Sequence, residues 1–369
     1  MKSIFSLLCF VLLFSSCTNT QDYEINLKWN KAYEQDTFKR SVTGLKWALS
    51  YLGSTLANNS LQKGITYKDS IITLNLKQLG FSEDAKETLA KLQFIFKNSE
   101  EYKKNNAMDL GRYIALTFGN SHHYYAIVGV PKSLNYFENL YKFDSIIGYI
   151  DNSSVSKVDR IISFSKISTN NKQGFISAEV DSISKEVLEY ETMEIMPNGQ
   201  LKFGIYDEKG NLKDAANSNI TRAGKPAKCI WCHEVVVQPL FRQQKNHKGY
   251  LSFMKINDTL KYFNHKLQDY QDSKWKDKSL RNKKLHTELE LLYISFMEPT
   301  AERISREWNM TLIEVKQKTS HLKTHNHEEF PFLGNLYHRK DIDLLAPFRY
   351  LEVPESIREK SNNKINLLK

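Results

Sequence analysis

Cysteine is scarce in this chain of 369 residues, which contains only Cys9, Cys17, Cys229 and Cys232. So few cysteines exclude a disulfide framework of the kind that holds small secreted domains together. Long apolar runs are also missing. Beyond the first residues, no uninterrupted apolar stretch approaches the roughly 20 residues that a membrane-spanning helix needs. The sequence contains neither an internal repeat nor a long low-complexity linker.

The overall composition is that of a folded protein. Hydrophobic residues make up 41% of the chain and charged residues 25%, which excludes wholesale disorder. The length allows two or three packed units with a sizeable core. Lys and Arg outnumber Asp and Glu by 52 to 42, so the formal net charge is +10.

The N-terminus has the charged, apolar and small residues of an export signal, in that order. Lys2 is followed by apolar residues 4–14, and then by Ser15, Ser16 and Cys17. The segment resembles a bacterial lipoprotein signal, with the letters FSSC in place of the usual lipobox. This resemblance implies that residues 1–16 are removed and that Cys17 becomes the lipidated first residue.

The predicted export signal accounts for two of the four cysteines. Cys9 would leave with the signal and Cys17 would carry lipid, so Cys229 and Cys232 would be the only side-chain thiols of the mature chain. We expect a protein anchored to a membrane through Cys17, in the periplasm or at the outer membrane of a bacterial cell envelope. Nucleic acid is a poor partner for such a protein, despite a pI near 9.1.

Hydrophobic periodicity predicts an α+β fold in three parts after a polar tether over residues 17–36. Residues 37–121 show helical spacing and predict a helical region. Residues 122–248 predict a β-rich region with antiparallel strands, ending in the cysteine motif. Residues 249–369 return to helical spacing.

Several local signals refine this scheme. "HHYYAIVGV" (122–130) is rich in aromatic and β-branched residues, which predicts a strand. Four further short segments between residues 157 and 207 have partly alternating patterns and predict the rest of an antiparallel unit. Ser82 is a predicted helix N-cap, and Thr311 with Glu314 matches a capping box.

The sequence "CIWCH" (229–233) is the motif that carries chemistry. Covalent attachment of c-type haem needs two thiols for the vinyl groups and an imidazole for the iron, and Cys-x-x-Cys-His supplies all three. A thioredoxin-like disulfide is one alternative, but a long loop separates the motif from the preceding predicted strand. Structural zinc is another, although no second cysteine pair follows.

Residues 222–234 resemble the haem-binding stretch of c-type cytochromes, and "KFGIYDEKGN" (202–211) is similar to part of the cytochrome P460-like proteins. The resemblance implies one covalent haem c, with thioether bonds at Cys229 and Cys232. It implies that His233 is the proximal iron ligand and that Trp231 lies against the haem edge. The fold of small class I cytochromes does not map onto the chain, because more than two hundred residues precede the motif.

The second iron ligand is open. Met297 lies at a downstream distance that would suit a distal ligand, while Met254 and His247 are nearer in sequence. An unligated distal position is equally allowed. The first hypothesis is therefore a monohaem cytochrome that transfers single electrons to a redox partner protein. The alternatives are a haem enzyme or sensor for peroxide or nitrogen oxides, and a haem-free lipoprotein with a structural disulfide.

Overall fold

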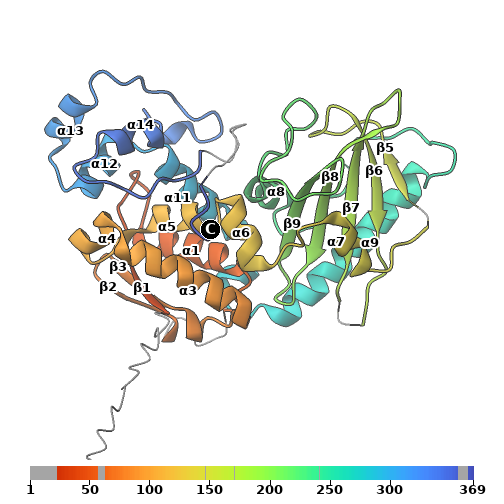
Figure 1. Cartoon of the computed structure of the whole chain (residues 1–369), viewed down its shortest axis with the longest axis horizontal. Coiled ribbons are helices and arrows are strands. Elements are labelled where there is room, and N and C mark those ends of the chain that lie inside the picture. The colour runs from red at the N-terminus through yellow and green to blue at the C-terminus, as the bar shows by residue number, and fades with distance from the viewer. Residues whose placement is uncertain (1–22, 57–62, 146, 170, 241, 356–364) are drawn as a thin grey trace, which may run out of the picture.

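The computed structural model describes residues 23–56, 63–145, 147–169, 171–240, 242–355 and 365–369. Within them the chain forms two lobes, one of helices around a small sheet and one built on a larger antiparallel sheet (Figure 1). The predicted α+β class is confirmed. The predicted signal segment and Cys17 lie outside the described residues. Among the described helices, none is both long and apolar enough to cross a membrane.

A four-stranded sheet begins the described part of the chain. Its strands, in spatial order, are β2 (Ile65–Lys68), β3 (Ile71–Asn75), β1 (Glu24–Lys28) and β4 (Met108–Asp109). Ile25 and Leu27 alternate into the core from β1, which pairs antiparallel with β3 and parallel with β4. The predicted tether is therefore wrong from Glu24 onward. Two core-facing residues are enough to hold this short strand in the sheet, because β3 and β4 supply its hydrogen-bond partners.

Helices cover this small sheet and form the first lobe. They are α1 (Phe38–Tyr51), α3 (Glu83–Asn98), α4 (Glu100–Asn105), α5 (Leu110–Thr117), α6 (Ser121–Val128) and, from far along the chain, α11 (Thr287–Met297). The predicted N-cap at Ser82 is confirmed, since its hydroxyl accepts a hydrogen bond from the Ala85 amide. A short 3-10 turn, η1 (Leu76–Gln78), links β3 to α3.

The predicted strand over residues 122–130 is wrong, because most of this segment is helix α6. Asn120 caps the helix by accepting a hydrogen bond from the His123 amide, and Gly129 ends it in the left-handed region at φ 66°. His123, Tyr124 and Tyr125 are buried against neighbouring elements. Capping residues and tertiary burial therefore override the strand preference of the aromatic and β-branched residues.

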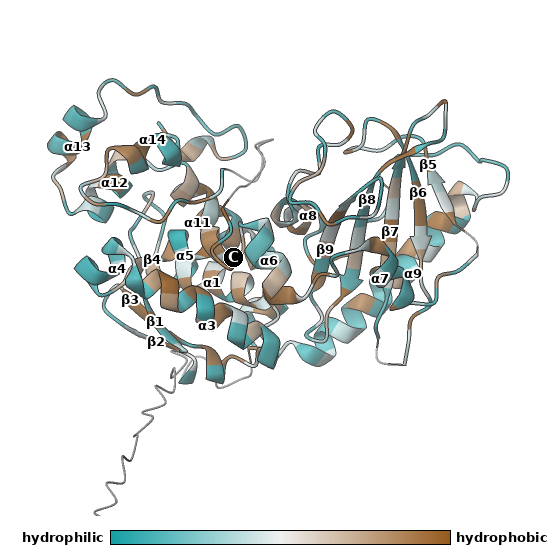
Figure 2. Cartoon of the chain, viewed as in Figure 1, coloured by the Kyte–Doolittle hydropathy of each residue, from teal (hydrophilic) through white to brown (hydrophobic). Residues whose placement is uncertain are grey.

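The second lobe is built on a five-stranded antiparallel sheet. Its strands, in both sequence and spatial order, are β5 (Gly148–Ile150), β6 (Asp159–Phe164), β7 (Gly174–Val180), β8 (Val187–Ile195) and β9 (Leu201–Asp207). The four predicted strands of this unit, β6 to β9, are confirmed. Figure 2 shows hydrophobic residues recurring along these strands, whereas α13 is largely hydrophilic.

Each face of the larger sheet has its own cover. α7 (Leu134–Asn139) and the turn before it cover one face, where the Tyr206 hydroxyl donates to the Pro131 carbonyl oxygen. On the other face lie α8 (Pro226–His233), next to β9, and the long α9 (Phe253–Lys274). Phe263 of α9 contacts the rings of Phe164 and Phe175.

The C-terminal part is helical, as predicted, but its helices serve different parts of the molecule (Figure 1). They are α9, α10 (Lys278–Arg281), η2 (Lys283–His286), α11, α12 (Ala301–Trp308), α13 (Leu312–Lys318), η3 (Pro331–Leu333) and α14 (Arg339–Leu344). The capping box of Thr311 and Glu314 is confirmed. α12, α13 and α14 enclose a small second core of their own.

Candidate functional site

The cysteine motif forms the last part of α8. Pro226 occupies the first turn, where its missing amide hydrogen costs nothing, and the helix ends at His233. Glu234 and Val235 follow in the left-handed region, with φ of 44° and 68°. A β-branched residue such as Val235 rarely adopts this conformation, and such strain is concentrated at functional sites. The strained turn redirects the chain immediately after the histidine.

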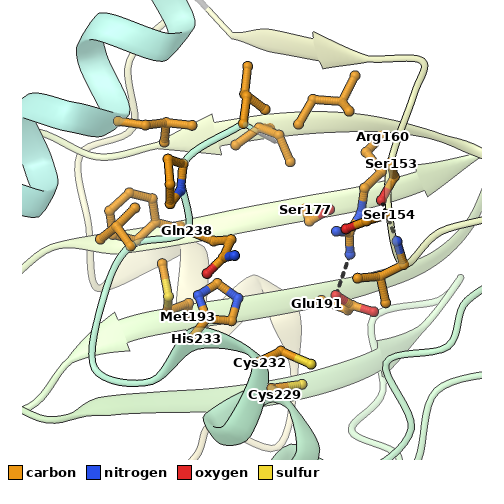
Figure 3. A pocket seen from close by; sticks show the side chains of 18 of the residues that line it. Ser153, Ser154, Arg160, Ser177, Glu191, Met193, Cys229, Cys232, His233 and Gln238 are labelled. Carbon is orange, nitrogen blue, oxygen red and sulfur yellow. Dashed lines mark hydrogen bonds and ion pairs between the residues drawn. The ribbon is translucent and has the colours of Figure 1, made fainter. Parts of the chain in front are cut away.

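Cys229, Cys232 and His233 line one cavity of about 430 Å³ between α8 and the larger sheet (Figure 3). This volume lies within the range of roughly 300–1,000 Å³ that is usual for ligand and cofactor sites. Apolar side chains supply much of the wall: Ile150, Val155, Ile162, Phe175, Ile176, Met193, Phe203, Val237, Pro239, Leu240 and Leu260.

His233 is held in the form that a metal ligand requires. Its Nδ1 lies 3.1 Å from the carbonyl oxygen of Val236, a contact in which Nδ1–H donates and Nε2 stays unprotonated. The Phe203 ring packs against the imidazole at a centroid distance of 5.1 Å. Burial lowers the pKa of His233 to about 4, so the ring is neutral at pH 7. A neutral imidazole with a free Nε2 can bind iron.

The two thiols lack the features of a redox-active pair. Burial raises the pKa of Cys229 well above its ordinary value, and burial also raises the pKa of Cys232. Thiol-disulfide enzymes need a lowered pKa, usually at a helix N-terminus, whereas these cysteines lie in the middle and last turn of α8. Both are free thiols in the structure. The arrangement therefore disfavours a thioredoxin-like centre.

A structural zinc site gains no support either. Over the described ranges, no group of three or more His, Cys, Asp or Glu side chains is arranged to hold a metal ion. Haem has a different requirement, because the porphyrin supplies four ligands and the protein needs to supply only the axial ones.

Arg160 and Glu191 line the cavity on the side of the sheet (Figure 3). The guanidinium of Arg160 pairs through Nε with Glu179 and through Nη2 with Glu191. Burial raises the pKa of Glu179, an effect that Arg160 opposes. One carboxylate oxygen of Glu191, Oε1, is buried without a hydrogen-bond partner among the described residues. A ligand in the cavity would meet the Arg160 guanidinium and the Glu191 side chain, because both residues line it.

The structure does not bring the other expected residues to this cavity. Met297 is buried at the end of α11 and borders a small hollow beside His338 and Arg339. Trp231 points away from the cavity, because its ring packs against Phe118 and Tyr293 of the first lobe. The structure therefore does not bring Trp231 to the cavity that the cysteines and His233 line.

Sequence reasoning missed Arg160, Glu191 and Met193. Met193 lines the cavity and is the cross-strand partner of Phe203, the residue that contacts His233. The signal was present in β8, where Glu189, Glu191 and Met193 alternate on one face. Charged residues that share a face with core residues on an interior strand mark a site rather than a solvated surface.

Comparison with protein-family models, curated proteins and solved structures finds no match to this chain. The site must therefore be judged on its own residues. They fit a covalent haem: two thiols one helical turn apart, a neutral imidazole with its Nε2 available, and a mainly apolar cavity that all three side chains line.

Proposed function

We propose that this protein carries one covalently bound haem c in the cavity between α8 and the larger sheet. The observation that carries the proposal is the convergence of Cys229, Cys232 and His233 on one cavity, with the imidazole neutral. Each thiol would add across one vinyl group, with sulfur bonding the carbon next to the ring and the thiol proton going to the terminal carbon, so that no oxidant or reductant would be consumed. His233 would hold the iron through Nε2.

The haem would supply an iron centre that can change oxidation state or bind a small molecule. The partly buried ion pair of Arg160 and Glu191 in the same cavity favours small-molecule binding, in an enzyme or a sensor. A simple electron carrier needs no ion pair in its haem cavity, and removing two charges from most of their contact with water costs free energy. Arg160 would donate a hydrogen bond to the bound molecule, and Glu191 would accept one.

One-electron transfer to a redox partner protein is the second candidate. It is favoured by the presence of Met193 in the cavity wall, because a thioether is a common second iron ligand in electron-transfer cytochromes. Met193 and His233 lie in the same part of the cavity wall, however, because Phe203 is the cross-strand partner of Met193 and its ring contacts the His233 imidazole. Met193 and His233 are therefore poorly placed to hold one iron between them.

The experiment is expression with haem-attachment machinery, followed by mass and visible spectroscopy. We expect the mature chain plus one haem, and loss of the attached haem when Cys229→Ala and Cys232→Ala are combined. A colourless protein without the haem mass would leave the haem-free lipoprotein with a disulfide. Met297→Leu is the matched control, and its spectrum should equal that of the wild type.

Carbon monoxide then separates the two modes. If the reduced protein shifts its spectrum on adding carbon monoxide, the iron has an open position and the small-molecule role stands. An unchanged spectrum indicates two firm protein ligands and favours electron transfer instead. Glu191→Gln leaves the attachment chemistry untouched and should change the affinity for ligands that donate a hydrogen bond more than the affinity for carbon monoxide.

We further propose that the protein is a lipid-anchored component of the bacterial cell envelope. The support is the signal-like N-terminus with Cys17, together with the fact that haem c is attached outside the cytoplasm. Cys17→Ser should abolish labelling with a radioactive fatty acid and release the protein from the membrane fraction. Retention of label in that variant would contradict the anchor.

A further inference from the structure

We infer that Arg242 and the loop of residues 152–154 form a carboxylate-binding subsite at the cavity mouth, which holds the haem propionates and so fixes the orientation of the haem. The inference rests on the proposed haem function and goes beyond it. It assigns a role to polar residues that neither attach the haem nor ligate the iron.

The topology of the lobe places the two ends of the cavity at different parts of the sheet. α8, with both cysteines, packs against β9, whereas residues 152–154 follow β5 at the opposite sheet edge. Figure 3 shows Ser153, Ser154 and Arg160 together at the end remote from Cys229 and Cys232. In haem, the propionate edge is opposite the edge that carries the vinyl groups. Thioether bonds on α8 therefore direct the propionates toward the loop.

Two arginines are available at that end, and their surroundings differ. Arg160 is already paired with Glu179 and Glu191, so the local charge of the three groups is negative when both carboxylates are ionised. A propionate placed there would meet two like charges. Arg242 instead donates to a neutral acceptor, Oδ1 of Asn152, at 3.1 Å. Its positive charge is the one that an added carboxylate would neutralise.

The exposure of the two arginines supports the same assignment. Arg242, Asn152 and Ser154 are exposed at the mouth of the cavity while also lining it. Carboxylates are costly to bury, and a cofactor with an apolar ring and two charged groups is best placed with its ring inside and its charges in contact with water. The mouth satisfies this condition better than the Arg160 cluster, whose Arg160, Glu179 and Glu191 side chains are 15%, 0% and 16% exposed.

Gln244 makes the mouth a built site rather than a loose surface. This buried side chain accepts hydrogen bonds at Oε1 from the amides of Asp151 and Asn152, both at 2.9 Å. Its Nε2 donates to the carbonyl oxygens of Asn152 at 3.0 Å and Arg242 at 2.9 Å. One side chain thus holds the loop and the arginine backbone together, and a preorganised donor set binds a carboxylate at less entropic cost.

The test measures non-covalent haem binding by the otherwise full-length Cys229→Ala, Cys232→Ala variant, with haem and with haem dimethyl ester, which lacks the two charges. The variant should bind haem more tightly than the ester. Adding Arg242→Gln should weaken haem binding about two- to fivefold, the loss expected for an ion pair in contact with water, while leaving ester binding unchanged. Arg242→Lys should restore part of the preference.

Arg222→Gln is the matched control, because Arg222 is exposed and is not among the described residues that line the cavity. It should preserve the preference for haem over the ester. If Arg242→Gln weakens haem and ester equally, or neither, the subsite is refuted although haem binding itself stands. If neither haem nor ester binds and the wild type also acquires no covalent haem, the proposed function fails first.

Discussion

The indole ring of Trp231 lies 5.4 Å, centroid to centroid, from the phenol ring of Tyr293, in an edge-on contact with an interplanar angle of 65°. Trp231 lies between the two cysteines on α8, and Tyr293 belongs to α11 in the first lobe. Phe118 contacts the same indole at 6.4 Å. The first lobe therefore supports α8 from behind, which gives the large helical part of the chain a physical role in positioning the motif.

Replacing Trp231 tests this support. Trp231→Ala should lower the free energy of unfolding by about 3–5 kcal/mol, the usual cost of removing a buried aromatic side chain. Trp231→Phe should cost much less, because it retains a ring and because Nε1 of Trp231 is buried without a partner in the described structure. Urea unfolding followed by circular dichroism measures both. Equal costs for the two variants would contradict the packing role.

A buried ionic cluster joins the first lobe to the C-terminal helices. Arg112 pairs with Asp343 at 2.8 Å, and Arg303 pairs with Asp109 at 2.8 Å. Glu101 lies 3.4 Å from the guanidinium of Arg112. Burial raises the pKa of Glu101 from 4.5 to about 8, so this carboxyl group is protonated in the folded protein at neutral pH.

Glu101→Gln should therefore flatten the pH dependence of stability. Between pH 4.5 and 8 the folded protein keeps a proton that the unfolded chain releases, so Glu101 makes stability fall as pH rises through that window. The slope is at most about 1.4 kcal/mol per pH unit. Glu101→Gln should therefore be more stable relative to wild type at pH 8 than at pH 5, as judged by the difference between their free energies of unfolding.

Glu100→Gln is the control for this prediction, because Glu100 is exposed and adjacent in sequence. Its difference from wild type should be the same at both pH values. A constant difference for Glu101→Gln as well would mean that Glu101 is already ionised in the folded protein at pH 5.

Local sequence signals predicted the elements whose partners are close in the chain. The strands β6 to β9 follow one another and pair with their neighbours, so alternation within each segment was sufficient. β1 was missed because it pairs with β3 and β4, which come much later. The segment 122–130 was misassigned because its capping residues, Asn120 and Gly129, decide against the strand preference of the residues between them.

The residues of the candidate site were likewise predictable only where they are close together in the sequence. Cys229, Cys232 and His233 lie within five residues of one short helix, so their convergence could be predicted from the sequence. Alternation along β8 places Glu191 on the same face as Met193, but Arg160 and Glu191 meet in the cavity only through the register of β6, β7 and β8, which no local pattern specifies. Met297 was a candidate by sequence distance alone, and the chain path carries it to α11 instead.

His286 gives an acid-sensitivity prediction outside the haem site. It is buried between Trp47 and Tyr51, with ring centroids at 5.4 and 5.5 Å, and burial lowers its pKa to about 4. In the unfolded chain His286 binds a proton near pH 6.5, whereas in the folded protein it stays neutral down to about pH 4. Stability is therefore lost as pH falls from 6.5 toward 4.

His286→Phe should remove this loss while keeping the ring packing. The free energy of unfolding of the variant minus that of wild type should be about 2 kcal/mol larger at pH 5 than at pH 8, as measured by urea unfolding. His265→Gln, at a largely exposed histidine, should show no such change. If the difference between His286→Phe and wild type is the same at pH 5 and pH 8, His286 is protonated in the folded state at pH 5.

Gly44 tests the contact between α1 and α11. A Cβ at this position would lie 2.6 Å from the backbone carbonyl oxygen of Glu288, which cannot rotate away as a side chain could. Helix propensity alone favours Gly44→Ala by about 1 kcal/mol, whereas overpacking costs about 1–3 kcal/mol or more. Because the obstacle is backbone, we expect the clash to win and the free energy of unfolding to fall. Thr43→Ala, on the same helix, should be neutral or slightly stabilising in the same urea titration. A stabilised Gly44→Ala would show that the two helices can separate without penalty.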